Sequence, residues 1–179
     1  DPNKDRFLFD QLSNSVKDKS ENVMIVDLVR NDLSITAKKS SVNVDDLCSV
    51  YPFNKVYQMI STVSSKIDST KYTFSDILET NFPMGSMTGA PKHSAMRIIE
   101  KFEETKRGIF SGSVGYIDPE GDFDFNVIIR SIIYDSVKKY LSVSVGGAIT
   151  NKSVEIEEYQ ECLTKASLMF KALNFNFDD

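Results

Sequence analysis

Acidic residues lie in pairs near both ends of the chain, where they could bind a metal ion. Asp18 and Glu21 are three residues apart, and Glu158 and Glu161 repeat this spacing. Residues three apart share one face of a helix, so each pair would present two carboxylates together. If the two helices converge, the carboxylates repel one another unless a cation lies between them, and Mg²⁺ suits such a site. The spacing alone is more typical of a solvated helix edge.

A second segment has the composition of an anion-binding loop. Its turn-forming and hydroxyl residues are Pro83, Gly85, Ser86, Thr88, Gly89 and Pro91, and Lys92 follows them. Glycine and proline impose a tightly turned backbone there. From Pro91 to Phe102 apolar residues recur at helical spacing, which predicts a helix whose N-terminal N–H groups point back at the loop.

This segment has an alternative interpretation as a nucleotide phosphate loop. The apolar run that ends in Asp27 resembles the strand that often accompanies such a loop. A phosphate loop, however, requires Gly immediately before its Lys and Ser or Thr after it. Pro91 and His93 occupy those places, so the pattern argues against nucleotide binding.

The composition argues against several kinds of binding and catalytic site. The net charge of −5 argues against a nucleic-acid-binding surface. His93 is the only histidine, so the chain has too few histidines for a typical zinc site and little basis for Ser-His or Cys-His catalysis. A bound metal must therefore be held by carboxylates. No apolar run is long enough to cross a membrane, and Cys48 and Cys162 have no pairing pattern. We expect a soluble cytoplasmic protein in which both thiols are buried.

The elements that position these groups follow from periodicity. The absence of a turn signal over 12–33 favours one long helix, and Val42 and Val44 alternate as a short strand. A half-buried strand is predicted over 56–67, a short helix over 73–81, three antiparallel strands within 111–145 and a helix over 154–173, before a polar tail from Asn174. At 179 residues and 41% hydrophobic, the chain predicts one compact unit with a sizeable core.

Four blocks in order resemble one enzyme family. They are P-x-G-S-x-T-G-A-P-K at 83–92 and the runs 21–33, 107–131 and 146–166. Together they resemble the chorismate-utilising enzymes, which include anthranilate, aminodeoxychorismate, isochorismate and salicylate synthases. The loop and the strand D-F-D-F-N-V-I-I-R-S at 122–131 are more similar to aminodeoxychorismate synthase component I than to anthranilate synthase.

The resemblance implies roles for individual residues. Glu21 and Glu161 would bind Mg²⁺ directly, while Asp18 and Glu158 would hold metal-bound water, although Asp18 is one methylene shorter than the usual Glu. Arg130 would bind the carboxylate of chorismate that the metal does not. The remaining implied site residues are Ser86, Thr88, Phe110, Gly146 and Gly147 for substrate binding, and Lys165 beside the metal as the candidate catalytic residue.

Two positions depart from the family pattern. Gln58 replaces a common His, and Phe110 replaces a common Tyr, so the contacts ascribed to those side chains are weakened or replaced. The general-acid Glu and the Lys of a P-I-K-G-T motif, both in the N-terminal half of relatives, are not among these residues.

The resemblance also implies an architecture and a reaction. It predicts an α/β fold (α+β) with two mainly antiparallel sheets packed between helices, of which residues 1–179 would be the C-terminal half of a single catalytic domain. The reaction would convert chorismate and ammonia, supplied by a glutamine amidotransferase subunit, to 4-amino-4-deoxychorismate for 4-aminobenzoate and folate synthesis. Anthranilate synthase and isochorismate synthase remain alternatives, as does a binding or assembly fragment that lacks the nucleophile.

Overall fold

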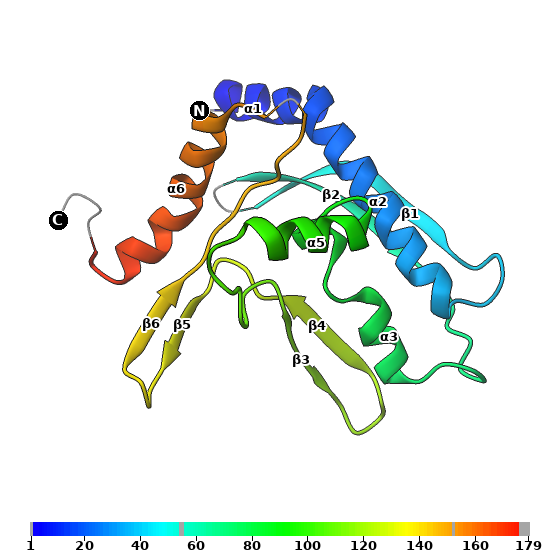
Figure 1. Cartoon of the computed structure of the whole chain (residues 1–179). Coiled ribbons are helices and arrows are strands. Elements are labelled where there is room, and N and C mark those ends of the chain that lie inside the picture. The colour runs from blue at the N-terminus through cyan, green and yellow to red at the C-terminus, as the bar shows by residue number, and fades with distance from the viewer. Residues whose placement is uncertain (1, 54–55, 152, 176–179) are drawn as a thin grey trace. The chain divides into compact units, whose positions relative to one another are not determined.

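The computed structural model describes residues 2–53, 56–151 and 153–175, and it divides into two compact units, Asp1–Glu103 and Glu104–Asp179. Both units combine helices with two-stranded antiparallel sheets (Figure 1). The predicted mixture of helices and antiparallel sheet is therefore confirmed. The assignment of residues 1–179 to a single catalytic domain stays a prediction.

Two helices, not one, open the first unit. Helix α1 spans Pro2–Asn14 and helix α2 spans Val16–Thr36, with a bend between them that is visible in Figure 1. Ser15 has extended backbone and its Oγ accepts a hydrogen bond from the Asp18 N–H at 3.2 Å, as an N-cap residue does. The prediction of one continuous helix was wrong because Ser15 and Asp18 form a helix start inside the apolar pattern.

A hairpin packs along α2. Strand β1 spans Asn43–Pro52 and strand β2 spans Tyr57–Ser64, and they pair antiparallel with irregular register between Val44 and Ser49. The predicted strand at 42–44 is thus the start of a much longer one, and the predicted strand at 56–67 is confirmed with shorter bounds. Cys48 lies in the irregular stretch at φ 57° and is half-buried, as is Cys162, so the prediction of two buried thiols was wrong.

Short backbone contacts tie the end of α2 to the end of β2. The Lys38 N–H donates to the Lys66 carbonyl at 2.7 Å, and the Asp68 N–H donates to the Thr36 carbonyl at 2.9 Å. Helix α3 follows at Phe74–Asn81, with Thr73 and Asp76 forming a reciprocal capping box. The predicted helix over 73–81 is confirmed.

The Asp68 turn makes the stability of the first unit sensitive to acid. Hydrogen bonds from Lys71 at 2.8 Å and from Thr70 at 2.6 Å lower the pKa of Asp68 from 3.8 to about 2. Because the pKa is lower in the folded state, its stabilising contribution is complete above the unfolded pKa and is lost as the pH falls towards 2.

We therefore expect Asp68→Asn to lower the free energy of unfolding by a constant amount above about pH 5, and by progressively less between about pH 4 and 2. Urea denaturation over this pH range measures the difference. Lys71→Met removes the largest cause of the pKa shift, so it should shrink the same acid-dependent component. A difference that stays constant down to pH 2 would contradict the assignment.

The signature segment, residues 83–92, contains one turn of helix. Helix α4 spans Gly85–Thr88, and Gly89 follows at φ 137°, a backbone conformation that favours glycine. Helix α5 spans Lys92–Phe102 after Pro91. The predicted helix after Pro91 is confirmed. The prediction of an irregular loop before it was wrong for Gly85–Thr88, which form the helical turn α4.

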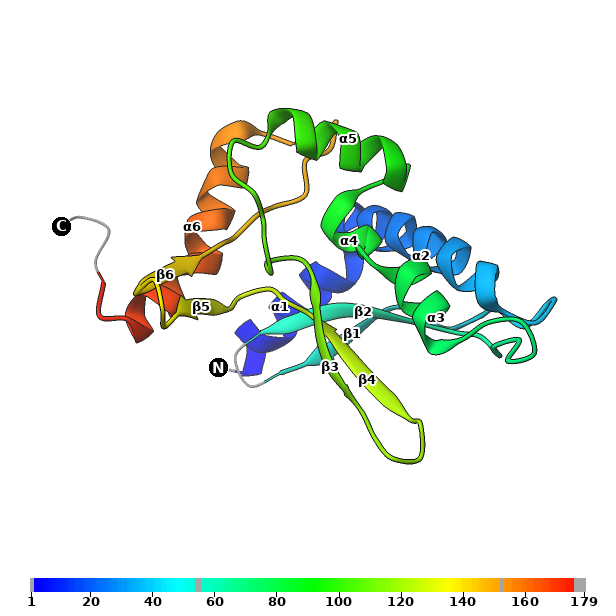
Figure 2. The ribbon, with the colours of Figure 1, turned by 60° about the horizontal axis from the view of Figure 1, so that its bottom comes forward.

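The second unit contains two hairpins. Strands β3 (Ser113–Ile117) and β4 (Phe123–Val127) form the longer one, which Figure 2 shows clearly, and strands β5 (Ile132–Asp135) and β6 (Tyr140–Val143) form the other. The predicted turn with Pro119 and Gly121 joins β3 to β4, and the Gly121 N–H donates to the Asp118 carbonyl at 3.1 Å. The prediction of three strands was wrong, because the chain leaves extended geometry at Arg130, whose φ is 49°.

Helix α6 spans Glu155–Ala172, as predicted within two residues. Of the tail predicted from Asn174, only Asn174 and Phe175 are described, and residues 176–179 lie outside the described part. None of the described helices combines the length and the apolar character that a membrane span requires.

The described residues bury little apolar surface. Their buried hydrophobic side chains are Val26, Ala166 and Met169, whereas large side chains such as Phe102, Val114 and Tyr116 are 69%, 58% and 64% exposed. The prediction of a sizeable core was wrong for these residues. A two-stranded hairpin buries apolar side chains only where another layer packs on its face, and many of these side chains remain exposed here.

Candidate functional site

The second unit brings together most of the site residues predicted within it. The glycines after β6 lie against α6: the Lys165 Nζ donates to the Gly146 carbonyl at 3.0 Å and forms an ion pair with Glu161 Oε1 at 2.6 Å. Glu158, one turn earlier on α6, is buried, and its Oε2 lies close to Gly147. Two carboxylates and one ammonium group thus lie beside exposed glycine backbone.

The contact between Gly147 and Glu158 gives a direct prediction. A Cβ built on Gly147 would lie 3.2 Å from Glu158 Oε2, whereas one built on Gly146 would contact nothing within 4 Å. Gly147→Ala must therefore displace a buried carboxylate, and we expect it to lower the free energy of unfolding by about 1 kcal/mol. Gly146→Ala is the matched control and should leave thermal denaturation unchanged. Equal effects of the two variants would contradict the packing described.

The other acidic pair lies in the first turns of α2. Asp18 is exposed, and its carboxylate accepts a hydrogen bond from the hydroxyl of the N-cap residue Ser15. Glu21 is half-buried, and its Oε1 atom is shielded from solvent. The prediction that Asp18 and Glu21 share a helix is confirmed.

The same helix contacts the signature segment. A Cβ on Gly85 would lie 2.9 Å from Leu28 Cδ1, so only glycine permits α4 to approach α2 this closely. Ser86 is exposed, whereas the half-buried Thr88 donates its hydroxyl to the Met84 carbonyl at 3.1 Å. Ser86 therefore presents the more accessible of the two predicted hydroxyls.

Arg130 and Phe110 lie on irregular backbone of the second unit. Arg130 is exposed between β4 and β5, and not in a strand as the sequence pattern at 122–131 predicted. Its left-handed backbone is one that few residues other than glycine adopt without strain. Phe110 is half-buried in the turn before β3. The roles of both residues in substrate binding stay predictions.

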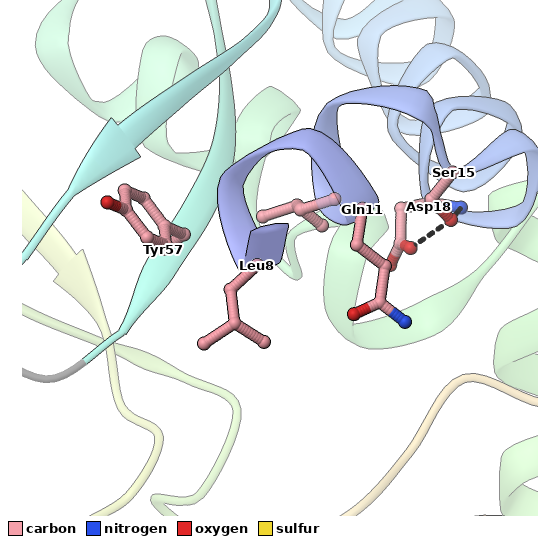
Figure 3. Close-up of a pocket in the computed structure, with 6 residues that line it drawn as sticks. Leu8, Gln11, Ser15, Asp18 and Tyr57 are labelled. Carbon is pink, nitrogen blue, oxygen red and sulfur yellow. Dashed lines mark hydrogen bonds between the residues drawn. The ribbon is translucent and has the colours of Figure 1, made fainter. Parts of the chain in front are cut away.

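A pocket of about 330 Å³ lies beside Asp18 in the first unit (Figure 3). Its lining residues are Leu8, Gln11, Leu12, Ser15, Asp18 and Tyr57. The Tyr57 hydroxyl donates to Asp5 at 2.6 Å, and this hydrogen bond raises the pKa of Tyr57. Of these residues the sequence pattern singled out only Asp18, although S-x-x-D at 15–18 is a recognisable capping signal.

The predicted metal site takes two carboxylates from each unit. Within each unit, the residues that the structure describes include no group of three or more His, Cys, Asp and Glu side chains that could hold a metal ion by itself. The donor set, Asp18 and Glu21 with Glu158 and Glu161, consists of carboxylate oxygens, which fit Mg²⁺ and not a soft metal. The meeting of the two pairs stays a prediction.

Comparison with known proteins decides the family. The family model described as "chorismate binding enzyme" matches residues 1–171. The chain belongs to the chorismate-binding enzymes. The signature segment and both acidic pairs lie within the matched range, so the resemblance inferred from four sequence blocks is confirmed.

Chorismate-binding enzymes of known name match most of the chain. Aminodeoxychorismate synthase component 1 of Escherichia coli is 39% identical over 173 residues, 97% of this chain and 38% of that protein. The chloroplastic aminodeoxychorismate synthase of Arabidopsis thaliana is 39% identical over 164 residues, 92% of this chain and 18% of that protein. The chain therefore spans much less than half of these two relatives.

A solved structure confirms the fold of this chorismate-binding chain. The anthranilate synthase component I of Streptococcus pneumoniae superposes with a TM-score of 0.78 and 33% sequence identity, covering 92% of this chain and 37% of that one.

Proposed function

We propose that this chain is part of an aminodeoxychorismate synthase, which converts chorismate and ammonia to 4-amino-4-deoxychorismate. The observation that carries the proposal is the 39% identity with the E. coli component 1 over nearly the whole chain. The signature segment, in which Ser86 and Thr88 precede G-A-P-K, supports the same subfamily. Anthranilate synthase is the second candidate, favoured by the 33% identity with the S. pneumoniae structure.

In this proposal both acidic pairs hold Mg²⁺, with Glu21 and Glu161 as direct ligands and Asp18 and Glu158 as partners of its water. When bound, Mg²⁺ supplies positive charge that orients the ring carboxylate of chorismate and offsets the charge of the departing hydroxyl. The ion pair with Lys165 involves one oxygen of Glu161, and it holds this carboxylate on the side of α6 that faces Gly146.

The substrate carries a second carboxylate, which we assign to Arg130. A guanidinium can donate two parallel hydrogen bonds to a carboxylate, and the exposed position of Arg130 leaves it accessible to a ligand. The hydroxyl of Ser86 and the backbone at Gly146 would add neutral hydrogen bonds. Phe110 and Gln58 occupy positions where many relatives have Tyr and His, so Phe110 offers only apolar contact.

A glutamine amidotransferase subunit is the proposed source of ammonia, supported by the name "component 1" of the E. coli relative. We also propose a reducing compartment such as the cytoplasm. Cys48 and Cys162 are free thiols, which such a compartment keeps reduced.

Product analysis tests the proposal. The full-length protein is incubated with chorismate, an ammonium salt and Mg²⁺, and the products are separated by liquid chromatography. We expect 4-amino-4-deoxychorismate. Anthranilate or isochorismate as the main product would assign the chain to the corresponding alternative, and no turnover with or without an added amidotransferase would leave a binding or assembly role as the better account.

A further inference from the structure

A largely buried ion pair joins the signature segment to α2. Lys92 Nζ lies 2.5 Å from Asp32 Oδ2, and the two side chains are only 19% and 8% exposed. The same ammonium group lies 3.4 Å from the Thr80 carbonyl at the end of α3. Three helices, α2, α3 and α5, thus meet at one positive charge.

This ion pair is the second of two attachments between the segment and α2. The first is the close contact of Gly85 with Leu28, which lies one helical turn before Asp32. Residues three or four apart occupy the same face of a helix, so Leu28 and Asp32 hold the start of α4 and the start of α5 on one face of α2. Ser86 and Thr88 lie between these two attachments.

Neither α4 nor α5 has a side-chain cap at its N-terminus. Met84, which precedes α4, and Pro91, which precedes α5, make no side-chain capping hydrogen bond. The hydroxyl of Thr88 bonds within its own turn, to the Met84 carbonyl. The segment is therefore positioned on α2 by its two attachments, the Gly85–Leu28 contact and the Lys92–Asp32 pair, and not by side-chain caps.

We propose that Asp32 is a positioning residue that, through Lys92, fixes the signature segment at a set distance from Glu21 on the same helix. The proposal rests on the proposed function, since Ser86 contacts substrate there and Glu21 is assigned to the metal. A pair that serves only to stabilise the fold would change the unfolding temperature without changing substrate affinity. A positioning pair changes affinity and local mobility, because small misplacements of binding groups have large effects.

The test compares two ion pairs of α2 in the full-length protein. Asp32→Asn, Lys92→Met and the double variant remove the buried pair. Asp27→Asn, Arg30→Met and their double variant remove an exposed pair, whose atoms are 2.9 Å apart and whose side chains are 66% and 52% exposed. Both Asp variants neutralise one charge on the same helix, which makes the second set a matched control.

We expect each buried-pair variant to raise the KM for chorismate about 10-fold or more, with kcat changed less than about threefold. The double variant should resemble either single variant, because one interaction is lost in all three. The control variants should keep KM within about twofold. Unchanged KM in folded buried-pair variants, with only a lower unfolding temperature, would overturn the proposal.

Hydrogen exchange gives a readout that does not require chorismate. In the buried-pair variants the amides of residues 84–90 should exchange about 10-fold faster or more, while those of β1 and β2 remain protected. If the wild-type protein fails to use chorismate but this local change is observed, the proposed function fails and the attachment stands. If exchange rises equally over the whole first unit, the attachment has no positioning role and this inference fails.

Asp32→Glu keeps the test decisive if the neutral variants do not fold. It retains both charges and adds one methylene, so the pair can form while the segment moves. We expect an increase in KM of about threefold or more and faster exchange over 84–90. A folded Asp32→Glu protein with wild-type KM and exchange would overturn the proposal.

Discussion

Glu21→Gln in the full-length protein is expected to lower kcat/KM for chorismate about 100-fold or more. The reason is that an amide cannot supply the negative charge that a directly bound Mg²⁺ requires, and the loss of a metal ion's electrostatic contribution amounts to several kcal/mol in the transition state. Steady-state kinetics at saturating ammonium measure the effect. Excess Mg²⁺ should restore part of the activity, because the variant weakens metal binding and leaves the other carboxylates in place.

Asp27→Asn is the control for this prediction. It neutralises an exposed carboxylate six residues further along α2. Asp27 pairs with Arg30 and is not one of the proposed metal ligands. Activity and its Mg²⁺ dependence should match the wild type. If Glu21→Gln retains wild-type activity at low Mg²⁺, Glu21 is not a ligand and the metal site has been assigned to the wrong carboxylates.

Arg130→Gly is expected to lower catalytic activity without lowering the free energy of unfolding. If Arg130 binds a substrate carboxylate through two charge-assisted hydrogen bonds, as proposed, removing its guanidinium should lower kcat/KM about 100-fold. The backbone at φ 49° favours glycine, so the free energy of unfolding should not fall, and relief of backbone strain should raise it by at most about 1 kcal/mol. Chorismate kinetics and urea denaturation measure the two effects on the same protein.

Lys139→Gly is a matched control for Arg130→Gly. Lys139 is also a cationic, exposed residue with left-handed backbone, at φ 53°, and it lies in the turn between β5 and β6. We expect the same small effect on stability and no effect on kcat/KM. A similar loss of activity in both variants would point to the general positive charge of the surface and not to a specific contact of Arg130.

Sequence patterns predicted the elements that have strong local signals. Thr73 and Asp76 supply a capping box for α3, and Pro119 with Gly121 supplies the turn between β3 and β4. Gly146 and Gly147, which the family resemblance assigned to substrate binding, lie against the acidic face of α6. The capping box and the turn depend on residues within a few positions of one another, the range over which a single sequence is informative, whereas the contact of Gly146 with Lys165 spans 19 positions.

The wrong predictions of helix and strand boundaries occurred where a weak local signal competes with a strong periodicity of apolar residues. Ser15 interrupts an almost continuous helical pattern, and the hydrogen bond that its hydroxyl accepts from the Asp18 N–H decides the helix boundary. Arg130 continues the alternation of the preceding strand in sequence, yet its backbone ends the extended geometry. The ion pair between Asp32 and Lys92 spans 60 positions, so no short motif could indicate it.

The spacing of Glu21 and Asp32 along helix α2 limits which sequence changes keep both side chains on the same face. Glu21 and Asp32 are 11 residues apart, which corresponds to about three turns, so both point in nearly the same direction around the axis. A deletion or insertion of one residue between them would rotate one relative to the other by about 100°. Substitutions that preserve the helix therefore keep Glu21 and Asp32 aligned, whereas an insertion or deletion of a single residue between them does not.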